Sequence, residues 1–170
     1  MAGFLDISAL AALTISGSAV LYAGSATIPA DDHGHHAAAS WPKYSGEPIR
    51  IKRASDGLFH VKVSFDGVDT FAIVDTGATY SMIDQTTLGR IAAKTGRNFA
   101  PAPGTQKIRT LSGAVDYRLA PVDEVTAEGV VLGPLNATAV AGHRGPSILG
   151  QDAIARFRSI RIEAGELILR

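Results

Sequence analysis

The feature that most constrains the fold is a pair of adjacent strands, the second of which ends abruptly in polar residues. Apolar and polar residues alternate from Phe59 to Phe65, which is the period of a half-buried strand. Asp66-Gly67 follows, and this dipeptide is typical of a two-residue hairpin turn because both positions tolerate positive φ. The return strand begins at Asp69 and ends in a continuous apolar run at Val74, so we expect burial on both faces.

The rest of the pattern predicts a mainly β domain over residues 49–170, with one or two short helices. One helix is expected between Asp84, which can cap its start, and Gly96, which can end it. Further strands are expected at Lys107–Leu111, Ala114–Ala120, Glu124–Leu132 and Ala137–Ala141. A short helix near Asp152–Phe157 then precedes a hairpin of Arg158–Ile162 and Glu166–Leu169, with its turn at Ala164-Gly165.

Two segments precede this domain. Residues 1–24 are mostly apolar and long enough to span a bilayer as a helix. They also fit a cleaved signal peptide, because the small residues Ala23–Ala26 resemble a cleavage site, although no Lys or Arg lies upstream. A loosely packed terminal helix is the third interpretation. Residues 25–48 have neither a strand nor a helix period and predict a flexible tether.

Composition excludes several classes of function. The net charge is zero and Lys and Arg form no basic stripe, which argues against a nucleic-acid-binding protein. Cysteine is absent, so the chain has no disulfide, thiolate metal site or cysteine nucleophile. His33, His35 and His36 lie in the tether, where we interpret them as solvated, because a metal site needs ligands in a fixed geometry. We expect no metal and no cofactor.

Two short motifs carry the chemistry. The buried strand that ends at Val74 is followed by Asp75-Thr76-Gly77-Ala78, and a later apolar pair and glycine form Ile148-Leu149-Gly150. Asp, Thr and Gly also occur together in ordinary turns, but the apolar strand before them and Ala78 after them make the motif more specific. With both motifs in this order, residues 58–170 resemble the aspartic protease superfamily, in particular its single-lobe, retropepsin-like branch. The bacterial membrane-anchored retropepsin-like proteins look most similar, because they share an apolar N-terminal segment and a tether.

The resemblance implies a retropepsin-like single-lobe β-barrel and a role for each motif residue. It implies that Asp75 is catalytic, that Thr76 hydrogen-bonds across a two-fold axis, and that the Gly77 N–H binds the Asp75 carboxylate. It also implies that Ile148, Leu149 and Gly150 support the catalytic loop. The hairpin Thr110-Leu111-Ser112-Gly113-Ala114 fits the flap that closes over a bound peptide, although a plain surface hairpin has the same pattern.

The chemistry explains why a second copy is needed. Two carboxylates a few ångström apart cannot both ionise, so they share one proton and can both activate water and protonate a carbonyl. One chain supplies one such carboxylate, so the second must be Asp75 of another subunit. The terminal hairpin offers two apolar strands for pairing between the copies, Arg158–Ile162 with Ile160 and Ile162, and then Leu167-Ile168-Leu169. The resemblance thus implies a homodimeric endopeptidase that acts on peptides or proteins, anchored in a membrane with its catalytic domain in the periplasm, or secreted if the segment is cleaved.

Three positions differ from related patterns. Ala78 replaces the serine of pepsin-type lobes, and losing that hydroxyl donor predicts a dyad that works at less acidic pH. Thr79 and Gln151 replace an Asp and an Arg that form an ion pair in retroviral enzymes, so that brace is missing. Two alternatives to the enzyme are a catalytically silent domain of the same fold, used for dimerisation or peptide binding, and a membrane-tethered β scaffold. The intact Asp-Thr-Gly-Ala argues against the first, and Ile148-Leu149-Gly150 against the second.

Overall fold

The computed structural model describes residues 43–99, 106–110 and 113–170. The predicted N-terminal segment, most of the tether and the three tether histidines lie outside these ranges. No helix of the described residues is long and apolar enough to cross a membrane. In chain order the elements are β1 Ile49–Lys52, β2 His60–Phe65, β3 Val68–Val74, α1 Gln85–Thr95, β4 Gln106–Thr110, β5 Gly113–Ala127, β6 Val130–Val140, β7 Ser147–Leu149, α2 Gln151–Ile154, β8 Ile160–Glu163 and β9 Glu166–Leu169.

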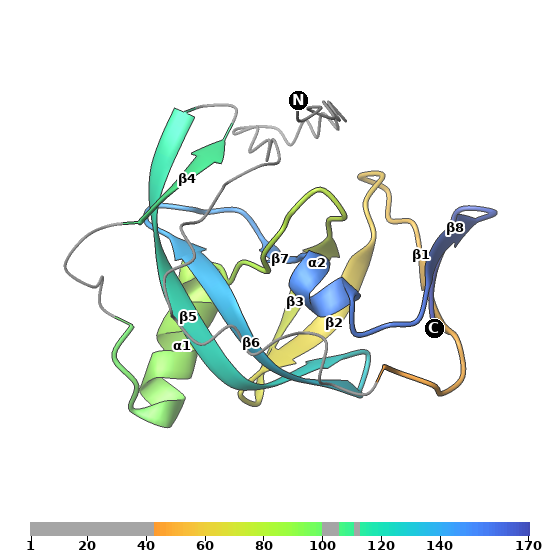
Figure 1. Ribbon diagram of the computed structural model, residues 1–170, viewed down its shortest axis with the longest axis horizontal. Helices are drawn as coiled ribbons and strands as arrows, with labels where there is room; N and C mark the ends of the chain where they lie inside the picture. The colour runs from red at the N-terminus through yellow and green to blue at the C-terminus, as the bar shows by residue number, and fades with distance from the viewer. Residues whose placement is uncertain (1–42, 100–105, 111–112) are drawn as a thin grey trace, which may run out of the picture.

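The strands form two sheets, which confirms the prediction of a mainly β fold (Figure 1). The larger sheet has the order β4-β5-β2-β3-β7, and β6 pairs with the long strand β5. The smaller sheet has the order β1-β9-β8. Strand β3 pairs antiparallel with β2 and parallel with β7, so the strand that leads to Asp75 lies inside the larger sheet.

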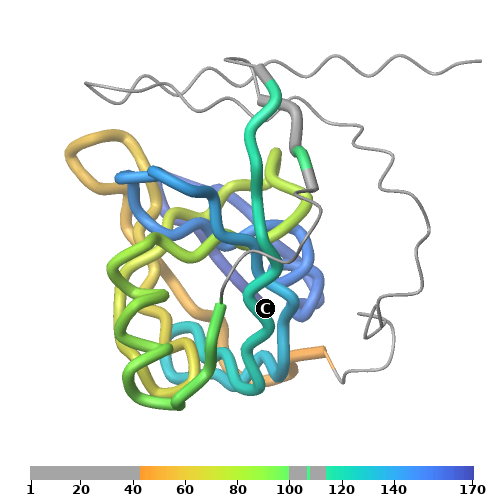
Figure 2. Tube along the Cα trace, turned by 90° about the vertical axis from the view of Figure 1, so that its left-hand side faces the viewer, coloured from red at the N-terminus to blue at the C-terminus, as the bar shows by residue number. Residues whose placement is uncertain are grey.

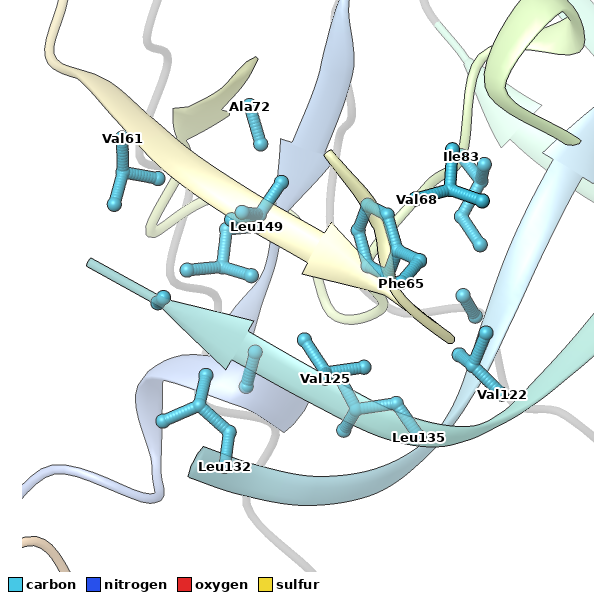
Figure 3. Packing of buried hydrophobic residues seen from close by; sticks show 14 of the residues in the cluster. Val61, Phe65, Val68, Ala72, Ile83, Val122, Val125, Leu132, Leu135 and Leu149 are labelled. Atoms are coloured by element: carbon cyan, nitrogen blue, oxygen red, sulfur yellow. The ribbon is translucent and has the colours of Figure 1, made fainter. Parts of the chain in front are cut away.

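One continuous core joins the two sheets. Phe65 of β2, Val125 of β5 and Leu149 of β7 are fully buried and belong to a single apolar cluster (Figure 3). Leu167 of β9 belongs to the same cluster. Tyr44, which falls in the predicted tether, also packs against this cluster, and its ring contacts that of Phe157 edge to face at 5.9 Å.

Local signals located α1 and two of the turns correctly. The Asp84 side chain accepts a hydrogen bond from the Thr87 N–H at 2.9 Å, and Gly96 ends α1 with a φ of 71°. The predicted turns at Asp66-Gly67 and Ala164-Gly165 are confirmed, and all four residues have positive φ. In each turn a glycine follows a residue that pays a conformational cost at positive φ.

The predicted strand Glu124–Leu132 is wrong. The chain reverses inside it at Glu128-Gly129, where φ is 49° and 80°. Both central residues have positive φ, as a tight hairpin requires. Glutamate is uncommon in this conformation, and the apolar residues on either side conceal the turn in the sequence. Two predicted strands therefore merge into β5, and β6 begins at Val130 rather than at Ala137.

The C-terminal elements are also shorter than predicted. Helix α2 covers Gln151–Ile154 instead of Asp152–Phe157, and β8 begins at Ile160 instead of Arg158. Strand β9 lies between β1 and β8 and pairs with both. Both edges of β9 are therefore occupied within the chain, so Leu167-Ile168-Leu169 offers no free edge. The strand expected at Arg158–Ile162 pairs with β9 alone among the described residues, and pairing of the terminal hairpin between copies stays a prediction.

Candidate functional site

The candidate site is built on the loop that follows β3. The Asp75 N–H donates to the Leu149 carbonyl at 3.1 Å, so the parallel pairing of β3 with β7 continues to the first residue of the loop. On the other side, the Val74 N–H donates to the Phe59 carbonyl at 3.1 Å. Because backbone hydrogen bonds hold Val74 on one side and Asp75 on the other, the chain has little freedom where the carboxylate leaves the sheet.

The loop itself fixes one carboxylate oxygen. The Gly77 N–H donates to Asp75 Oδ1 at 2.8 Å, as the resemblance implied. A Cβ at Gly77 would lie only 3.2 Å from the same oxygen, so glycine suits this close approach. Asp75 is half-buried and Thr76 is exposed, whereas Ala78 is buried. The carboxylate and the threonine side chain are thus both accessible to a second molecule.

Gly150 packs directly against the backbone of the loop, so closely that any side chain at this position would collide with it. A Cβ at Gly150 would lie 2.6 Å from the Tyr80 carbonyl carbon and 2.9 Å from the Ala78 carbonyl oxygen. Its φ is −92°, which other residues adopt, so the need for glycine is steric. The next residue, Gln151, donates its N–H to the Ala78 carbonyl at 2.8 Å.

The side chain of Gln151 makes a second contact that the sequence did not predict. Its Nε2 donates to the Thr76 carbonyl at 2.6 Å. Thr79 and Gln151 cannot form the ion pair expected of retroviral enzymes, but Gln151 still braces the Asp75 loop with a neutral hydrogen bond. Nothing local in the sequence pairs Gln151 with Thr76.

Ser81 and Asp152 form a buried network beside the loop, also missed from sequence. The N–H and the Oγ of Ser81 donate to Asp152 Oδ1 at 2.9 and 2.7 Å. The Gly150 N–H donates to Ser81 Oγ at 3.0 Å, so one serine contacts both the second motif and α2. Burial raises the pKa of the Asp152 carboxyl above its ordinary value, against the hydrogen bonds from Ser81 and the charge of Arg156. Nothing in the sequence indicated that Ser81 and Asp152, which are 71 residues apart, form a hydrogen bond.

The flap candidate is a hairpin of β4 and β5. Thr110 pairs with Gly113, and Lys107 with Asp116, whose carboxylate lies 3.0 Å from Lys107 Nζ. Leu111 and Ser112 lie outside the described residues, whereas Ala114 is exposed on β5. The hairpin projects away from the rest of the domain in both views (Figures 1 and 2). Its role as a flap stays a prediction.

The remaining predicted supporting residues lie beside the Asp75 loop. Ile148 pairs with Ile73, and Leu149 with Val74, in the parallel ladder of β3 and β7. Leu149 is fully buried, whereas Ile148 is half-buried. Among the residues that the structure describes, no group of three or more His, Asp or Glu side chains is placed to hold a metal ion.

Comparisons with known proteins agree with this geometry. Residues 61–153 match the family model described as aspartyl protease, a range that includes both motifs. No curated protein matches the sequence. Among solved structures, the chain is similar to a retropepsin-like aspartic protease from Rickettsia conorii, with 22% identity, a TM-score of 0.55, and coverage of 72% of this chain and 89% of that one. It is also similar to the retroviral protease-like domain of Ddi1 from Leishmania major, with 18% identity, a TM-score of 0.43, and coverage of 63% and 82%.

Proposed function

The chain belongs to the aspartyl protease family and has a retropepsin-like fold, and on that premise we propose that it is a homodimeric endopeptidase in which two copies of Asp75 hydrolyse peptide bonds. The observation that carries the proposal is the catalytic loop. Asp75 is half-buried at the end of a sheet strand, and one of its oxygens accepts the Gly77 N–H at 2.8 Å. That contact holds the carboxylate in one orientation.

Two such carboxylates would divide the work of hydrolysis. The ionised one accepts a proton from a water molecule as that water attacks the scissile carbonyl carbon. The protonated one donates its proton to the carbonyl oxygen, which gives a neutral tetrahedral intermediate. The carboxyl that took the proton from water then passes it to the amide nitrogen, while the other, now ionised, carboxylate takes a proton from a hydroxyl of the intermediate. The C–N bond breaks, the two peptides leave, and the pair again holds one proton.

Thr76 supports the need for two copies. Its side chain is exposed at the tip of the loop, while its carbonyl is held by Gln151 Nε2. An exposed hydroxyl on a fixed backbone is suited to a hydrogen bond with a symmetry-related loop, and a closed two-fold dimer would bring the two loops face to face.

The test is hydrolysis of a diverse peptide library by the full-length protein. Asp75→Asn keeps the shape of the side chain but removes the shared proton, so cleavage should vanish. Asp69→Asn is the matched control, because Asp69 lies on β3, the strand that leads to Asp75, and its exposed carboxylate forms a surface pair with Lys62 at 3.5 Å. Peptide binding without cleavage by the wild type would favour the silent-domain alternative, and persistent cleavage by Asp75→Asn would exclude this dyad.

We also propose that residues 1–24 anchor the enzyme to a membrane, with the catalytic domain on the periplasmic side. The support is the apolar character of this segment and the tether that follows it. Anchoring would confine the copies to two dimensions and raise their effective concentration. Copies that associate only weakly in solution would then dimerise more readily.

A further inference from the structure

The net charge of zero conceals an uneven distribution of charge along the chain. Residues 1–42 carry three aspartates and no Lys or Arg, whereas the segments 43–53 and 158–170 together carry seven Lys or Arg and three glutamates. Residues 54–157 are close to balance, with nine Lys or Arg and ten Asp or Glu. The positive excess is therefore confined to the two end segments of the domain, 43–53 and 158–170, which we call the basic end.

The fold brings these two segments together. Strand β1 pairs with β9 along its whole length. The Tyr44 N–H donates to the Arg156 carbonyl at 2.9 Å, two residues before Arg158. Ser159 and Arg170 exchange two backbone hydrogen bonds, both at 3.0 Å. Cations from the start and from the end of the described chain thus meet around the smaller sheet, which is why no basic stripe is visible in the sequence.

Much of this charge lies on one face of the smaller sheet. Leu167 and Leu169 point to the other face, where they belong to the apolar core. Because alternate residues of a strand point to opposite faces, the register gives the remaining face four cations and two anions. They are Arg50, Lys52, Arg161 and Arg170, with Glu163 and Glu166.

Four cations of the basic end are not neutralised by a neighbouring carboxylate. The two glutamates on this face pair with Arg50 and Arg161 at 3.2 and 3.1 Å, and Arg53 lies over the ring of Phe59 at 4.6 Å. The others are exposed, and no Asp or Glu of the described residues forms an ion pair with any of them: Lys43, Lys52, Arg158 and Arg170. The terminal carboxylate of Arg170 offsets at most one of these charges. The basic end therefore has a positive potential.

The predicted tether enters the domain at the basic end, on the side of the molecule away from the flap candidate. Lys43 is the first described residue, and the smaller sheet and the hairpin of β4 and β5 lie at opposite ends of the long axis (Figure 1). Residues 25–42 are 18 residues of the predicted tether, and a flexible chain of that length spans about 20–25 Å on average. A membrane anchor at residues 1–24 would therefore keep the basic end close to the bilayer surface.

We propose that the basic end docks on anionic lipid headgroups, through Lys43, Lys52, Arg158 and Arg170, and directs the flap hairpin away from the bilayer. The proposal rests on the proposed membrane anchor and adds a second contact to it. Each Lys or Arg beside an anionic bilayer favours binding about fivefold. The attraction extends only about 10 Å at about 0.1 M ionic strength, so the tether brings the domain near and the cations then orient it. The docked enzyme receives its peptide from the aqueous side.

Fluorescence quenching in vesicles tests the docking directly. The chain has no cysteine, so Ser159→Cys provides one dye site at the basic end, and Ala114→Cys provides one on the flap hairpin. Both positions are exposed. Full-length protein is reconstituted in phosphatidylcholine vesicles that carry a headgroup quencher, with or without phosphatidylglycerol. Phosphatidylglycerol should increase the quenching at position 159 and leave position 114 unchanged. Quenching at position 159 that ignores lipid charge overturns the proposal, and would fit cations bound instead to Asp31 and Asp32 of the tether.

Charge removal and salt supply the controls. Lys52→Gln and Arg158→Gln should each lower the ratio of docked to free domain about fivefold, and a variant with all four cations changed to Gln should not dock. Arg144→Gln is the matched control, because Arg144 is exposed outside the basic end and forms no ion pair with a described residue. Raising the salt from about 0.1 M to about 1 M shortens the Debye length from about 10 Å to about 3 Å and should release the domain. Single variants with a wild-type thermal midpoint that dock like the wild type, or like Arg144→Gln, overturn the proposal.

The anchor, the enzyme and the docking surface can fail separately. Full-length protein that leaves neutral vesicles at high salt would refute the anchor, while binding to anionic vesicles that the four-cation variant loses would still support this surface. Protein that stays on neutral vesicles, with no effect of phosphatidylglycerol at position 159, would refute this surface alone. Binding of nucleic acid in place of anionic vesicles would also refute it. None of these measurements uses hydrolysis, so Asp75→Asn should dock like the wild type even if the proposed dyad is wrong.

Discussion

The side-chain nitrogen of Gln151 lies 2.6 Å from the carbonyl oxygen of Thr76 and joins the two motifs of the chain. The hydrogen bond is exposed to solvent, so it contributes little to the stability of the fold. Its importance is geometric, because Thr76 lies next to the carboxylate and presents its own side chain outward. In the sequence, Gln151 indicated only that an ion pair was missing, but in the structure its side chain braces the loop through a hydrogen bond.

Replacing Gln151 should therefore slow catalysis without unfolding the protein. A neutral hydrogen bond contributes about 1 kcal/mol, so Gln151→Glu, which has nearly the same shape but no N–H to donate, should lower kcat/KM about fivefold or more. Gln151→Arg, which retains N–H donors, should lose less. The loss should appear in kcat rather than in KM, with an unchanged thermal midpoint. Equal activity of the Glu variant and the wild type would show that the contact positions nothing.

A matched pair of glycine substitutions tests the close packing under the catalytic loop. Gly150→Ala places a methyl group 2.6 Å from the Tyr80 backbone, and this overpacking should destabilise the domain by about 1–3 kcal/mol. Gly89→Ala is the control, because a Cβ at this exposed position of α1 meets nothing within 4 Å. It should stabilise the helix by about 0.5–1 kcal/mol. Denaturant unfolding of the two variants should show opposite signs, and a harmless Gly150→Ala would contradict the steric argument.

The buried Asp152 predicts a specific dependence of stability on pH. Burial raises the pKa of its carboxyl in the folded state above the 3.8 of the free group. The folded protein then binds more protons than the unfolded chain between these two pKa values, so ionisation costs stability as pH rises through this window. Asp152→Asn keeps an oxygen that accepts from Ser81 and removes this cost.

The measurement compares the free energy of unfolding of the wild type and Asp152→Asn across pH. The variant should gain stability relative to the wild type as pH rises, and each unit of pKa elevation is worth about 1.4 kcal/mol. The gain should disappear at a pH well below the ordinary value of the carboxyl. A wild type that instead becomes more stable than the variant with rising pH would mean that Arg156 outweighs burial.

The catalytic loop could be predicted from sequence because its signals are local. An apolar run, then Asp75, Thr76 and Gly77, are consecutive residues, and the end of the apolar run shows where the strand ends. The expected burial of that run on both faces was wrong, because Phe71 is 62% exposed. The structure places the loop next to Ile148-Leu149-Gly150, as the family resemblance implied, and adds the parallel pairing of β7 with β3, which was not predicted. Local pattern and turn chemistry likewise located α1 and the terminal hairpin.

The supporting contacts could not be predicted, because they join residues that are distant in the sequence. The pair of Ser81 and Asp152 spans 71 residues, and the pair of Thr76 and Gln151 spans 75. No periodic pattern in the sequence identifies either pair. A single polar residue in an apolar segment could equally well face solvent, so its partner cannot be inferred. The turn at Glu128-Gly129 was missed for a different reason, because glutamate is uncommon at positive φ and is not one of the usual turn residues.

The proposed anchor predicts where the protein is found after cell fractionation. The full-length chain should remain with the membrane fraction and resist extraction with high salt, because an apolar helix is held by hydrocarbon rather than by charge. A chain that begins at Lys43, the first described residue, should be soluble. Full-length protein in the soluble fraction, shortened near Ala26, would instead indicate a cleaved signal peptide.

The last prediction is that activity depends on the association of two copies. The mechanism needs two carboxylates, and the chain supplies one Asp-Thr-Gly-Ala sequence, at Asp75. In a closed two-fold dimer the same surface of each copy faces the other, which places both Asp75 residues beside the axis. The brace between Gln151 and Thr76 lies within one chain, so it orders each loop but does not hold the copies together.

Specific activity of the soluble chain should therefore fall on dilution, in step with the dimer fraction measured by sedimentation. An excess of Asp75→Asn chains should suppress wild-type activity, because mixed dimers carry one ionisable group instead of two. Asp69→Asn chains in the same excess are the control, since their dimers keep both Asp75 residues and should not suppress activity. Specific activity that stays constant at concentrations where only monomer sediments would show that one chain suffices, and the single-lobe mechanism would then be wrong.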